Sequence, residues 1–276
     1  MAGSDGNRAR LITRFAPSPT GPLHLGHAYS AMLAHDMAMA AGGTFLLRIE
    51  DIDQTRARPQ WEAQILDDLH WLGLTWPTPV MRQSDRGPAY DAALDALWQR
   101  GLLYPCTCNR RDILTAASAP QEGAPMGPDG VIYPGTCSGK PRSGPRPTDS
   151  ALRLDTSLAL QGNDAHGLPD DVPTTIGDVV LARRDMGTSY HLSVVVDDAA
   201  QGVTHVLRGE DLSDATPIHI LLQRLLGLVT PTYRHHRLIR DEAGKRLAKR
   251  DDARAIAIYR ADGASPQDIR AMVGLA

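Results

Sequence analysis

The sequence lacks the features of a membrane or secreted protein. No apolar run in its 276 residues approaches the length of about 20 residues that a membrane-spanning helix needs. Residues 1–10 contain no apolar segment of the kind that a secretory signal carries. The only cysteines are Cys106, Cys108 and Cys137, too few for a disulfide framework and compatible with reduced thiols or a metal site. We therefore expect a cytoplasmic protein that does not bind a membrane.

The sequence also lacks a basic charge excess and a P-loop. Its net charge of −3 is not typical of a nucleic-acid-binding protein, although it does not exclude one. Basic residues do cluster between residues 234 and 254, where eight Lys and Arg face four acids; on charge alone, a solvated face is favoured. No G-x-x-x-x-G-K-[ST] motif occurs, so phosphates would need another site. A hydrophobic content of 42% and the chain length favour one catalytic domain with an insertion.

Residues 14–27, RFAPSPTGPLHLGH, contain what we interpret as the floor of an active site. Their prolines and glycines predict a turn between a buried strand at residues 11–15 and a helix that runs to about residue 40. A strand, turn and helix start form an anion site in α/β sheets. His24 and His27 could donate hydrogen bonds to a phosphoryl group, and Gly26 leaves room for a flat ring, which predicts an ATP site. A bare H-x-G-H would more simply be a helix cap with one surface or core histidine.

Two further strands end in charged residues. The strand predicted at residues 44–49 leads into Glu50, which could hold an α-ammonium group, although neighbouring Asp51 and Asp53 could simply cap a helix. The strand predicted at residues 203–207 leads into Arg208, which suits capture of a carboxylate or, alternatively, a surface ion pair. A later strand is expected at residues 236–239.

The three cysteines suit zinc, which needs a fourth ligand for a tetrahedral site. From these residues alone, a metal site and a group of buried, unreactive thiols are equally plausible interpretations. The candidates for the fourth ligand are Tyr133, Asn109, Asp112, Asp129 and His166.

The RFAPSPTGPLHLGH segment resembles the first signature of class I aminoacyl-tRNA synthetases, and its opening is similar to their glutamyl and glutaminyl branch. The resemblance implies a Rossmann-type catalytic domain that activates an amino acid with ATP and Mg²⁺. Residues 245–250, KRLAKR, resemble the second signature, K-M-S-K-S, with Ala248 in place of the serine. Lys249 is then expected to offset charge on the leaving pyrophosphate.

The resemblance implies two substrate sites. Residues 187–198 resemble the family strand whose tyrosine, here Tyr190, faces the amino acid. The glutamate site would comprise Arg14, Phe15, Ala16, Pro17, Ser18, Glu50, Tyr190 and Arg208. The ATP site would comprise His24, Gly26, His27, Arg246, Leu247 and Lys249, of which His24, His27 and Lys249 would be catalytic. Two arginines would favour glutamate over glutamine, because a neutral amide leaves buried charge uncompensated.

The order C-x-C, then Y-x-x-x-C, is similar to that of a branch whose structural zinc is bound by the residues matching Cys106, Cys108, Tyr133 and Cys137. The sequence is also too short to include the anticodon-binding domain of glutamyl-tRNA synthetases. In this it resembles the glutamyl-queuosine tRNA(Asp) synthetases, a truncated branch of the family. The resemblance implies that a monomer forms glutamyl adenylate from L-glutamate and ATP without tRNA. It then transfers glutamate to queuosine in the anticodon of tRNA(Asp). Alternatives are a stand-alone glutamyl-tRNA synthetase acting at a tRNA 3′ end, a nucleotidyltransferase with an H-x-G-H site, and a non-enzymatic tRNA-binding relic.

The expected fold class is α/β, a class I Rossmann-type parallel sheet with an inserted zinc-bearing subdomain and a short C-terminal helical region. The expected parts are a disordered leader (1–9), the first half of the catalytic domain (10–103), the insertion (104–189), the second half (190–228) and a KMSKS-like loop with terminal helices (229–276).

Overall fold

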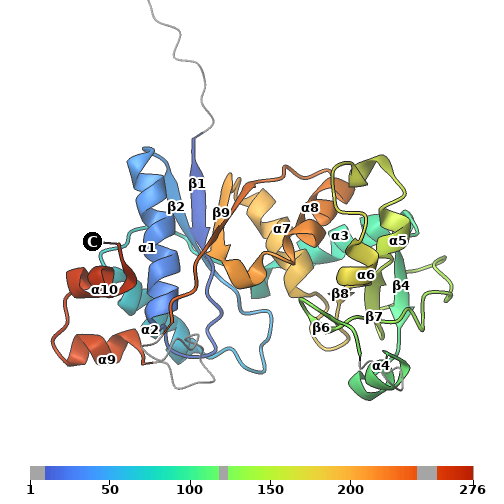
Figure 1. Cartoon of the computed structure of the whole chain (residues 1–276), viewed down its shortest axis with the longest axis horizontal. Coiled ribbons are helices and arrows are strands. Elements are labelled where there is room, and N and C mark those ends of the chain that lie inside the picture. The colour runs from blue at the N-terminus through green and yellow to red at the C-terminus, as the bar shows by residue number, and fades with distance from the viewer. Residues whose placement is uncertain (1–9, 118–123, 241–253, 276) are drawn as a thin grey trace, which may run out of the picture. The chain divides into compact units, whose positions relative to one another are not determined.

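The computed structural model describes residues 10–117, 124–240 and 254–275, and it divides into two compact units. The first unit comprises Met1–Arg82, Gly202–Glu210 and Pro231–Ala276. The second unit comprises Gln83–Gln201 and Asp211–Thr230. Segments far apart in the sequence therefore belong to the same unit, as the blue and red segments around α1 illustrate (Figure 1).

A parallel sheet is the centre of the first unit. Its strands are β1 (Ile12–Phe15), β2 (Thr44–Ile49), β3 (Met81–Arg82), β9 (His205–Gly209) and β10 (Thr232–His236). One ladder has the order β1-β2-β3, and β10 pairs with β9; all these pairings are parallel. β9 lies beside β1, where the Thr204 amide donates to Ile12 O at 3.0 Å (Figure 1). Parallel strands place their carboxyl ends at one edge, which confirms the expected α/β architecture.

Helix α1 (Leu25–Ala40) covers this sheet. Its buried face carries small side chains, among them Ala28, Ala31 and Ala34, which allow the helix to approach the strands closely. The same core contains Phe15 and Ile49 from the strands. Burial of these apolar side chains fixes the start of α1 directly after the proline-rich turn.

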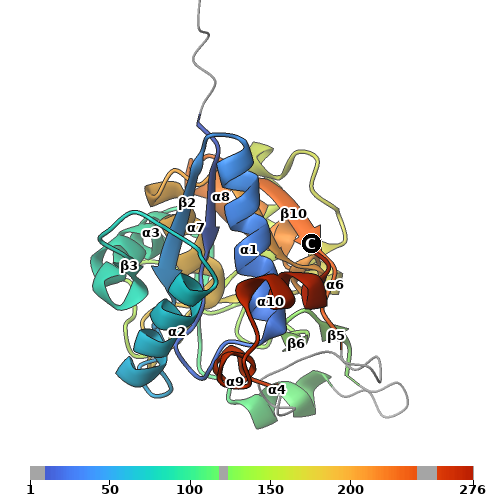
Figure 2. The same cartoon turned by 90° about the vertical axis from the view of Figure 1, so that its left-hand side faces the viewer.

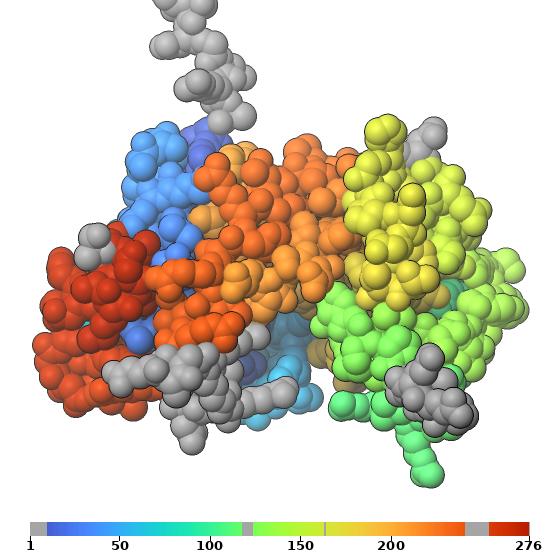
Figure 3. All heavy atoms as spheres, in the orientation of Figure 1, coloured from blue at the N-terminus to red at the C-terminus, as the bar shows by residue number. Residues whose placement is uncertain are grey.

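The described residues of the first unit form three more helices: α2 (Pro59–Trp71), α9 (Ile256–Ala261) and α10 (Pro266–Val273). α10 begins with a capping box between Ser265 and Asp268 and ends at Gly274, whose φ of +74° favours glycine. Its buried Ile269 joins the core around α1. α10 lies across α1 in Figure 2, and the red atoms of α9 and α10 lie at the surface beside it in Figure 3. The sequence predicted both terminal helices.

The second unit combines helices with an antiparallel sheet. The sheet has the order β4-β7-β8, with β4 at Leu103–Cys106, β7 at Ala151–Leu154 and β8 at Val180–Ala182. A hairpin joins β5 (Met126–Gly127) to β6 (Gly130–Val131). The longer helices are α3 (Gly87–Gln99), α4 (Arg110–Ala117), α7 (Tyr190–Ala200) and α8 (Thr216–Leu225). The short helical segments are η1 (Gln83–Arg86), α5 (Thr156–Ala159), η2 (Asn163–Ala165) and α6 (Val172–Thr175), and η3 (Glu210–Leu212) follows β9.

Two predicted elements are wrong. Residues 187–198 were expected to form a strand, but α7 is a helix from Tyr190 to Ala200. It is buried around most of its circumference, so its apolar run shows no helical period, and packing overrides the strand preference of the valines. The strand expected at residues 236–239 lies earlier, at Thr232–His236, where exposed and half-buried polar residues give no apolar signal.

Among the helices of the described residues, none is both long and apolar enough to span a bilayer.

Candidate functional site

The two histidines of the first signature cap helix α1. His24 is the N-cap residue, and its Nδ1 accepts a hydrogen bond from the Gly26 amide at 3.1 Å. The His24 amide in turn donates to Nδ1 of His27 at 3.2 Å. The two rings are in close contact, with centroids 3.8 Å apart and planes tilted by 36°. Because each Nδ1 accepts a hydrogen bond, a neutral ring carries its proton on Nε2, where it can donate to an anion at the helix start.

The C-terminal part of the first unit returns to this turn. Ala255 forms an antiparallel bridge with His24, and the Ile256 amide donates to Leu23 O at 2.8 Å. The predicted ATP-binding residues Arg246, Leu247 and Lys249 lie outside the described residues. After these residues, the described chain continues, and its Ala255 lies beside His24.

The glutamate candidates of the first unit meet at the carboxyl ends of its strands. The Glu50 amide donates to Pro17 O at 3.0 Å, which joins the end of β2 to the proline-rich turn. Around this turn Phe15 and Pro17 are buried, Ala16 is half-buried and Ser18 is exposed.

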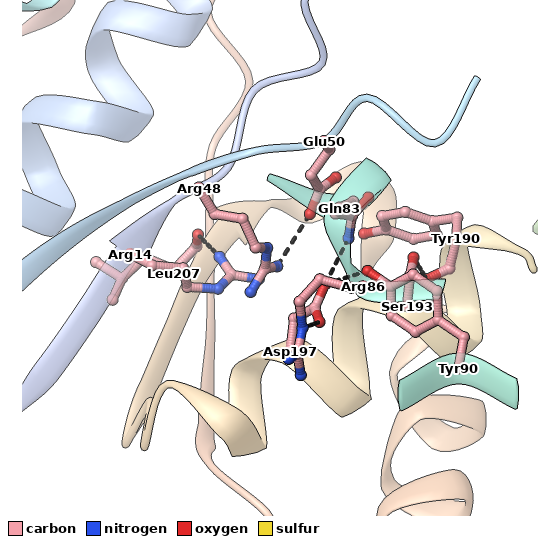
Figure 4. A network of polar contacts seen from close by, with 10 residues as sticks. All are labelled: Arg14, Arg48, Glu50, Gln83, Arg86, Tyr90, Tyr190, Ser193, Asp197 and Leu207. Carbon is pink, nitrogen blue, oxygen red and sulfur yellow. Dashed lines mark hydrogen bonds and ion pairs between the residues drawn. The ribbon is translucent and has the colours of Figure 1, made fainter. Parts of the chain in front are cut away.

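Arg48 is a residue that the sequence reasoning missed. Its side chain is 0% exposed, and its Nη2 donates to Glu50 Oε1 at 2.9 Å (Figure 4). A guanidinium inside an otherwise apolar strand was the signal that could have revealed it. The ion pair fixes the direction of the Glu50 carboxylate.

The two predicted carboxylate-binding arginines come from neighbouring strands. Arg14 of β1 is 7% exposed and donates from Nη1 to Leu207 O at 3.4 Å (Figure 4). Arg208 of β9 is 5% exposed, lies 4.9 Å from the centre of the Tyr233 ring and donates from Nε to His235 Nε2 at 3.4 Å. The structure therefore brings both guanidinium groups to adjacent strands of one sheet.

Tyr190, the remaining glutamate candidate, belongs to the second unit and is the first residue of α7. Its ring makes edge-to-face contacts with His191 and His219, with centroids 5.7 Å apart in each case. Its carbonyl accepts a hydrogen bond from Ser193 Oγ at 3.2 Å.

A buried carboxylate, Asp197, anchors α7 two turns after Tyr190. Its side chain is 0% exposed and accepts hydrogen bonds from Gln83 Nε2 at 3.0 Å, Tyr90 Oη at 2.7 Å and Arg86 Nε at 3.1 Å (Figure 4). Sequence reasoning missed this group as well, although two acids after three valines were a visible signal. Three donors compensate the burial of its charge.

The predicted zinc ligands lie together in the second unit. The three thiol sulfurs lie within 4.8 Å of one another, and Sγ of Cys108 and Cys137 are 3.6 Å apart. Tyr133 Oη lies 3.4 Å from Sγ of both Cys106 and Cys108. Tetrahedral zinc at its usual bond lengths would separate its sulfur ligands by about 3.8 Å and a sulfur from an oxygen by about 3.5 Å. The donor set therefore fits zinc.

Protonation in this cluster also favours a metal. Burial alone would raise the pKa of Cys137, but hydrogen bonds from Tyr133, the Thr107 backbone, Cys108 and Lys140 lower it to about 6. Burial raises the pKa of Cys108. A thiolate at Cys137 would be available near neutral pH as the first ligand.

Three of the other candidates for the fourth ligand, Asn109, Asp112 and Asp129, have hydrogen-bond partners outside the cluster. The amides of Asn109 and Asp112 each donate to the other's side chain, at 2.8 and 3.0 Å, where α4 begins. Asp129 pairs with His191 at 2.6 Å. Tyr133, whose hydroxyl already lies between the thiols, suits the fourth position better.

Comparison with known proteins decides the family. The sequence profile described as tRNA synthetases class I (E and Q), catalytic domain, matches residues 10–125 and 167–276. The chain belongs to this family of class I synthetases. Within it, the chain is 67% identical to the glutamyl-Q tRNA(Asp) synthetase of Rhodobacter capsulatus, over 96% of this chain and 100% of the relative. The corresponding enzyme of Geobacter sulfurreducens is 44% identical, over 91% of this chain and 79% of the relative.

Comparison with solved structures also places this chain in the class I synthetase family. A glutamate tRNA ligase from Elizabethkingia meningosepticum, in complex with its amino acid, aligns with a TM-score of 0.76 and 26% identity. The alignment covers 96% of this chain and 60% of the ligase, so this chain spans less than two thirds of the ligase. Methionyl-tRNA synthetase of Mycobacterium tuberculosis aligns with a TM-score of 0.59 at 11% identity and supports the fold alone.

Proposed function

We propose that this synthetase activates L-glutamate with ATP and transfers the glutamyl group to queuosine in the anticodon of tRNA(Asp). The observation that carries the proposal is the 67% identity to a glutamyl-Q tRNA(Asp) synthetase over that relative's full length. A nucleotidyltransferase with the same H-x-G-H element would not need the Glu50, Tyr190 and Arg208 set. ATP and tRNA are cytoplasmic substrates, so we expect the protein to act in the cytoplasm, as a monomer.

In the first step, the glutamate α-carboxylate attacks the α-phosphate of ATP, and pyrophosphate leaves. The start of α1 attracts the phosphate through its amides and its dipole. His24 and His27, with their Nδ1 atoms occupied, donate from Nε2 to the charge that develops on the phosphoryl oxygens. A Cβ atom on Gly26 would lie 3.0 Å from Cε1 of His24, so glycine keeps the backbone open beside this ring, where the adenine would lie.

The leaving pyrophosphate needs positive charge. Bound Mg²⁺ would neutralise part of it when ATP is present. Lys249 would supply the rest, with Arg246 and Leu247 against the nucleotide. Lys249 is six residues before Ala255, which limits its distance from this bridge partner of His24 to about 20 Å.

The glutamate site would combine opposite charges. Glu50, held by buried Arg48, would bind the α-ammonium group, and Arg14 and Arg208 would bind the side-chain carboxylate. Tyr190 and Ser18 would donate hydroxyls, and Phe15, Ala16 and Pro17 would line the site. Two buried guanidinium groups select glutamate, because glutamine would leave their charge uncompensated.

We further propose one structural zinc ion, bound by Cys106, Cys108, Tyr133 and Cys137. Cys106 ends β4 and Cys108 follows it, Tyr133 lies in the loop after β6, and Cys137 lies in the turn at Gly135. The zinc would hold together loop-rich segments that have a small hydrophobic cluster of their own.

ATP–pyrophosphate exchange tests the first step. We expect exchange with glutamate in the absence of tRNA, and at least 100-fold less with glutamine. Exchange that requires tRNA, or that proceeds equally with both amino acids, would contradict the proposed pocket.

A further inference from the structure

Three residues of the second unit form a hydrogen-bonded chain that the proposed reaction does not use. Asp129 Oδ2 lies 2.6 Å from Nε2 of His191, and Nδ1 of His191 lies 3.0 Å from Nε2 of His219. His191 and His219 are buried, at 5% and 0% exposure. The residues come from the β5–β6 hairpin, α7 and α8, so the chain connects three separate elements.

Asp129 determines which ring atoms carry protons. Partial burial would raise the pKa of Asp129, but the hydrogen bond and charge of His191, together with Arg183 and Arg153, lower it. The ionised carboxylate only accepts hydrogen bonds, so His191 donates from Nε2. When both rings are neutral, Nδ1 of His191 must accept, and His219 must donate from Nε2. One carboxylate thus fixes two tautomers and the orientation of both rings.

Both imidazole rings pack on Tyr190. Their planes lie at 62° and 68° to the tyrosine ring, and their centroids are 5.2 Å from each other, so two adjacent imidazoles make edge-to-face contacts with the phenol. A rotation of either imidazole would change the space available to the Tyr190 ring. The orientation of the phenol therefore depends on the hydrogen-bonded chain that begins at Asp129.

The hairpin that carries Asp129 is itself fixed in place. A Cβ atom on Gly127 would lie 2.7 Å from Thr175 O, so only glycine permits this close approach. Across the turn, Gly130 has a φ of +102°. Asp129, Tyr190 and His191 line one cavity of about 600 Å³. Asp129 thus lines this cavity from a turn that packs closely against Thr175.

We infer that Asp129 is a positioning residue for glutamate binding: through His191 and His219 it orients Tyr190, and the geometry of that phenol determines affinity for the amino acid. The inference rests on the proposed function, in which Tyr190 contacts glutamate. Asp129 itself touches no substrate.

The test measures ATP–pyrophosphate exchange with Asp129→Asn, because asparagine can donate or accept and so no longer fixes the tautomer of His191. We expect the KM for glutamate to rise about fivefold, with kcat and the KM for ATP within about twofold of the wild type. Asp129→Glu keeps the carboxylate and should restore the KM for glutamate. Asp149→Asn, at an exposed carboxylate of the same unit, is the matched control and should change nothing. The Asp129 side chain is 58% exposed, so its substitution should leave the fold intact.

A double-mutant cycle tests whether Asp129 affects glutamate binding through Tyr190. Tyr190→Phe removes the hydroxyl and should raise the KM for glutamate by itself. Adding Asp129→Asn to that variant should then have no further effect, because both changes act on one group. Additive effects, equal effects on glutamate and ATP, or an unchanged KM in Asp129→Asn would overturn the inference while leaving the proposed function in place. Absence of glutamate-dependent exchange in the wild type would overturn both.

Discussion

Replacing Asp197 by alanine should destabilise the protein by about 3–5 kcal/mol. The substitution leaves buried Gln83 and Tyr90 without their carboxylate acceptor, and a hydrogen bond to a charged group contributes about 1.5–3 kcal/mol. Arg86 is 28% exposed and can regain water, so its lost ion pair adds at most about 1 kcal/mol. Together these terms give about 3–7 kcal/mol, and the loss of about 3–5 kcal/mol seen when one partner of a buried ion pair is removed selects the lower part of that range.

The assay is urea unfolding of the purified protein, monitored by circular dichroism. Asp197→Asn keeps one acceptor oxygen and should lose less stability than Asp197→Ala. Asp170→Asn, at an exposed carboxylate of the same unit, should stay within about 0.5 kcal/mol of the wild type. If Asp197→Ala also remained within 1 kcal/mol, the three hydrogen bonds would not be the anchor of α7, and the reasoning would be refuted.

Three further predictions concern the reaction, the pH dependence and the metal. His27→Ala should lower kcat for glutamate-dependent pyrophosphate exchange about 10²–10³-fold, and unchanged exchange would remove its role. Burial and the charge of Asp67 raise the pKa of Asp68 to about 6. The native state therefore binds the Asp68 proton more tightly than the unfolded state does. As a result, the free energy of unfolding should fall as the pH rises from about 4 to 6. Asp68→Asn should therefore increase stability in urea at pH 7.5 but not at pH 4, and an equal effect at both values would contradict the burial argument. Cys137→Ser should remove the one equivalent of bound zinc, as measured by elemental analysis. It should also increase amide hydrogen exchange in β4 and in the β5–β6 hairpin. A full equivalent of zinc in the variant would exclude Cys137 as a ligand.

Local patterns predicted much of the first unit. The strand predicted at residues 44–49 has the same bounds as β2, and the turn before α1 follows from its prolines and glycines. These elements follow from short-range rules, because turn residues and apolar periods act over a few positions. The three cysteines and Tyr133 were predicted to be zinc ligands, and their side chains lie together in the structure.

The remaining features depend on partners far away in the sequence. α7 was expected to be a strand, because its three valines favour β structure and its burial on several sides removes the helical period. Arg48 and Asp197 are visible in the sequence as charges within or directly after apolar runs, but their roles could not be predicted, since a buried charge is explained only by the partners that the fold brings to it. The same holds for Asp129, whose contact with His191 spans 62 residues.

The most direct test of the proposed function is to locate the glutamate on its tRNA. Labelled glutamate, ATP and the protein are incubated with tRNA(Asp) that either contains or lacks queuosine, and the product is cut into anticodon-arm and acceptor-arm fragments. The account predicts label in the anticodon fragment of the queuosine-containing tRNA alone. Label at the 3′ end, or equal labelling of both tRNAs, would contradict it.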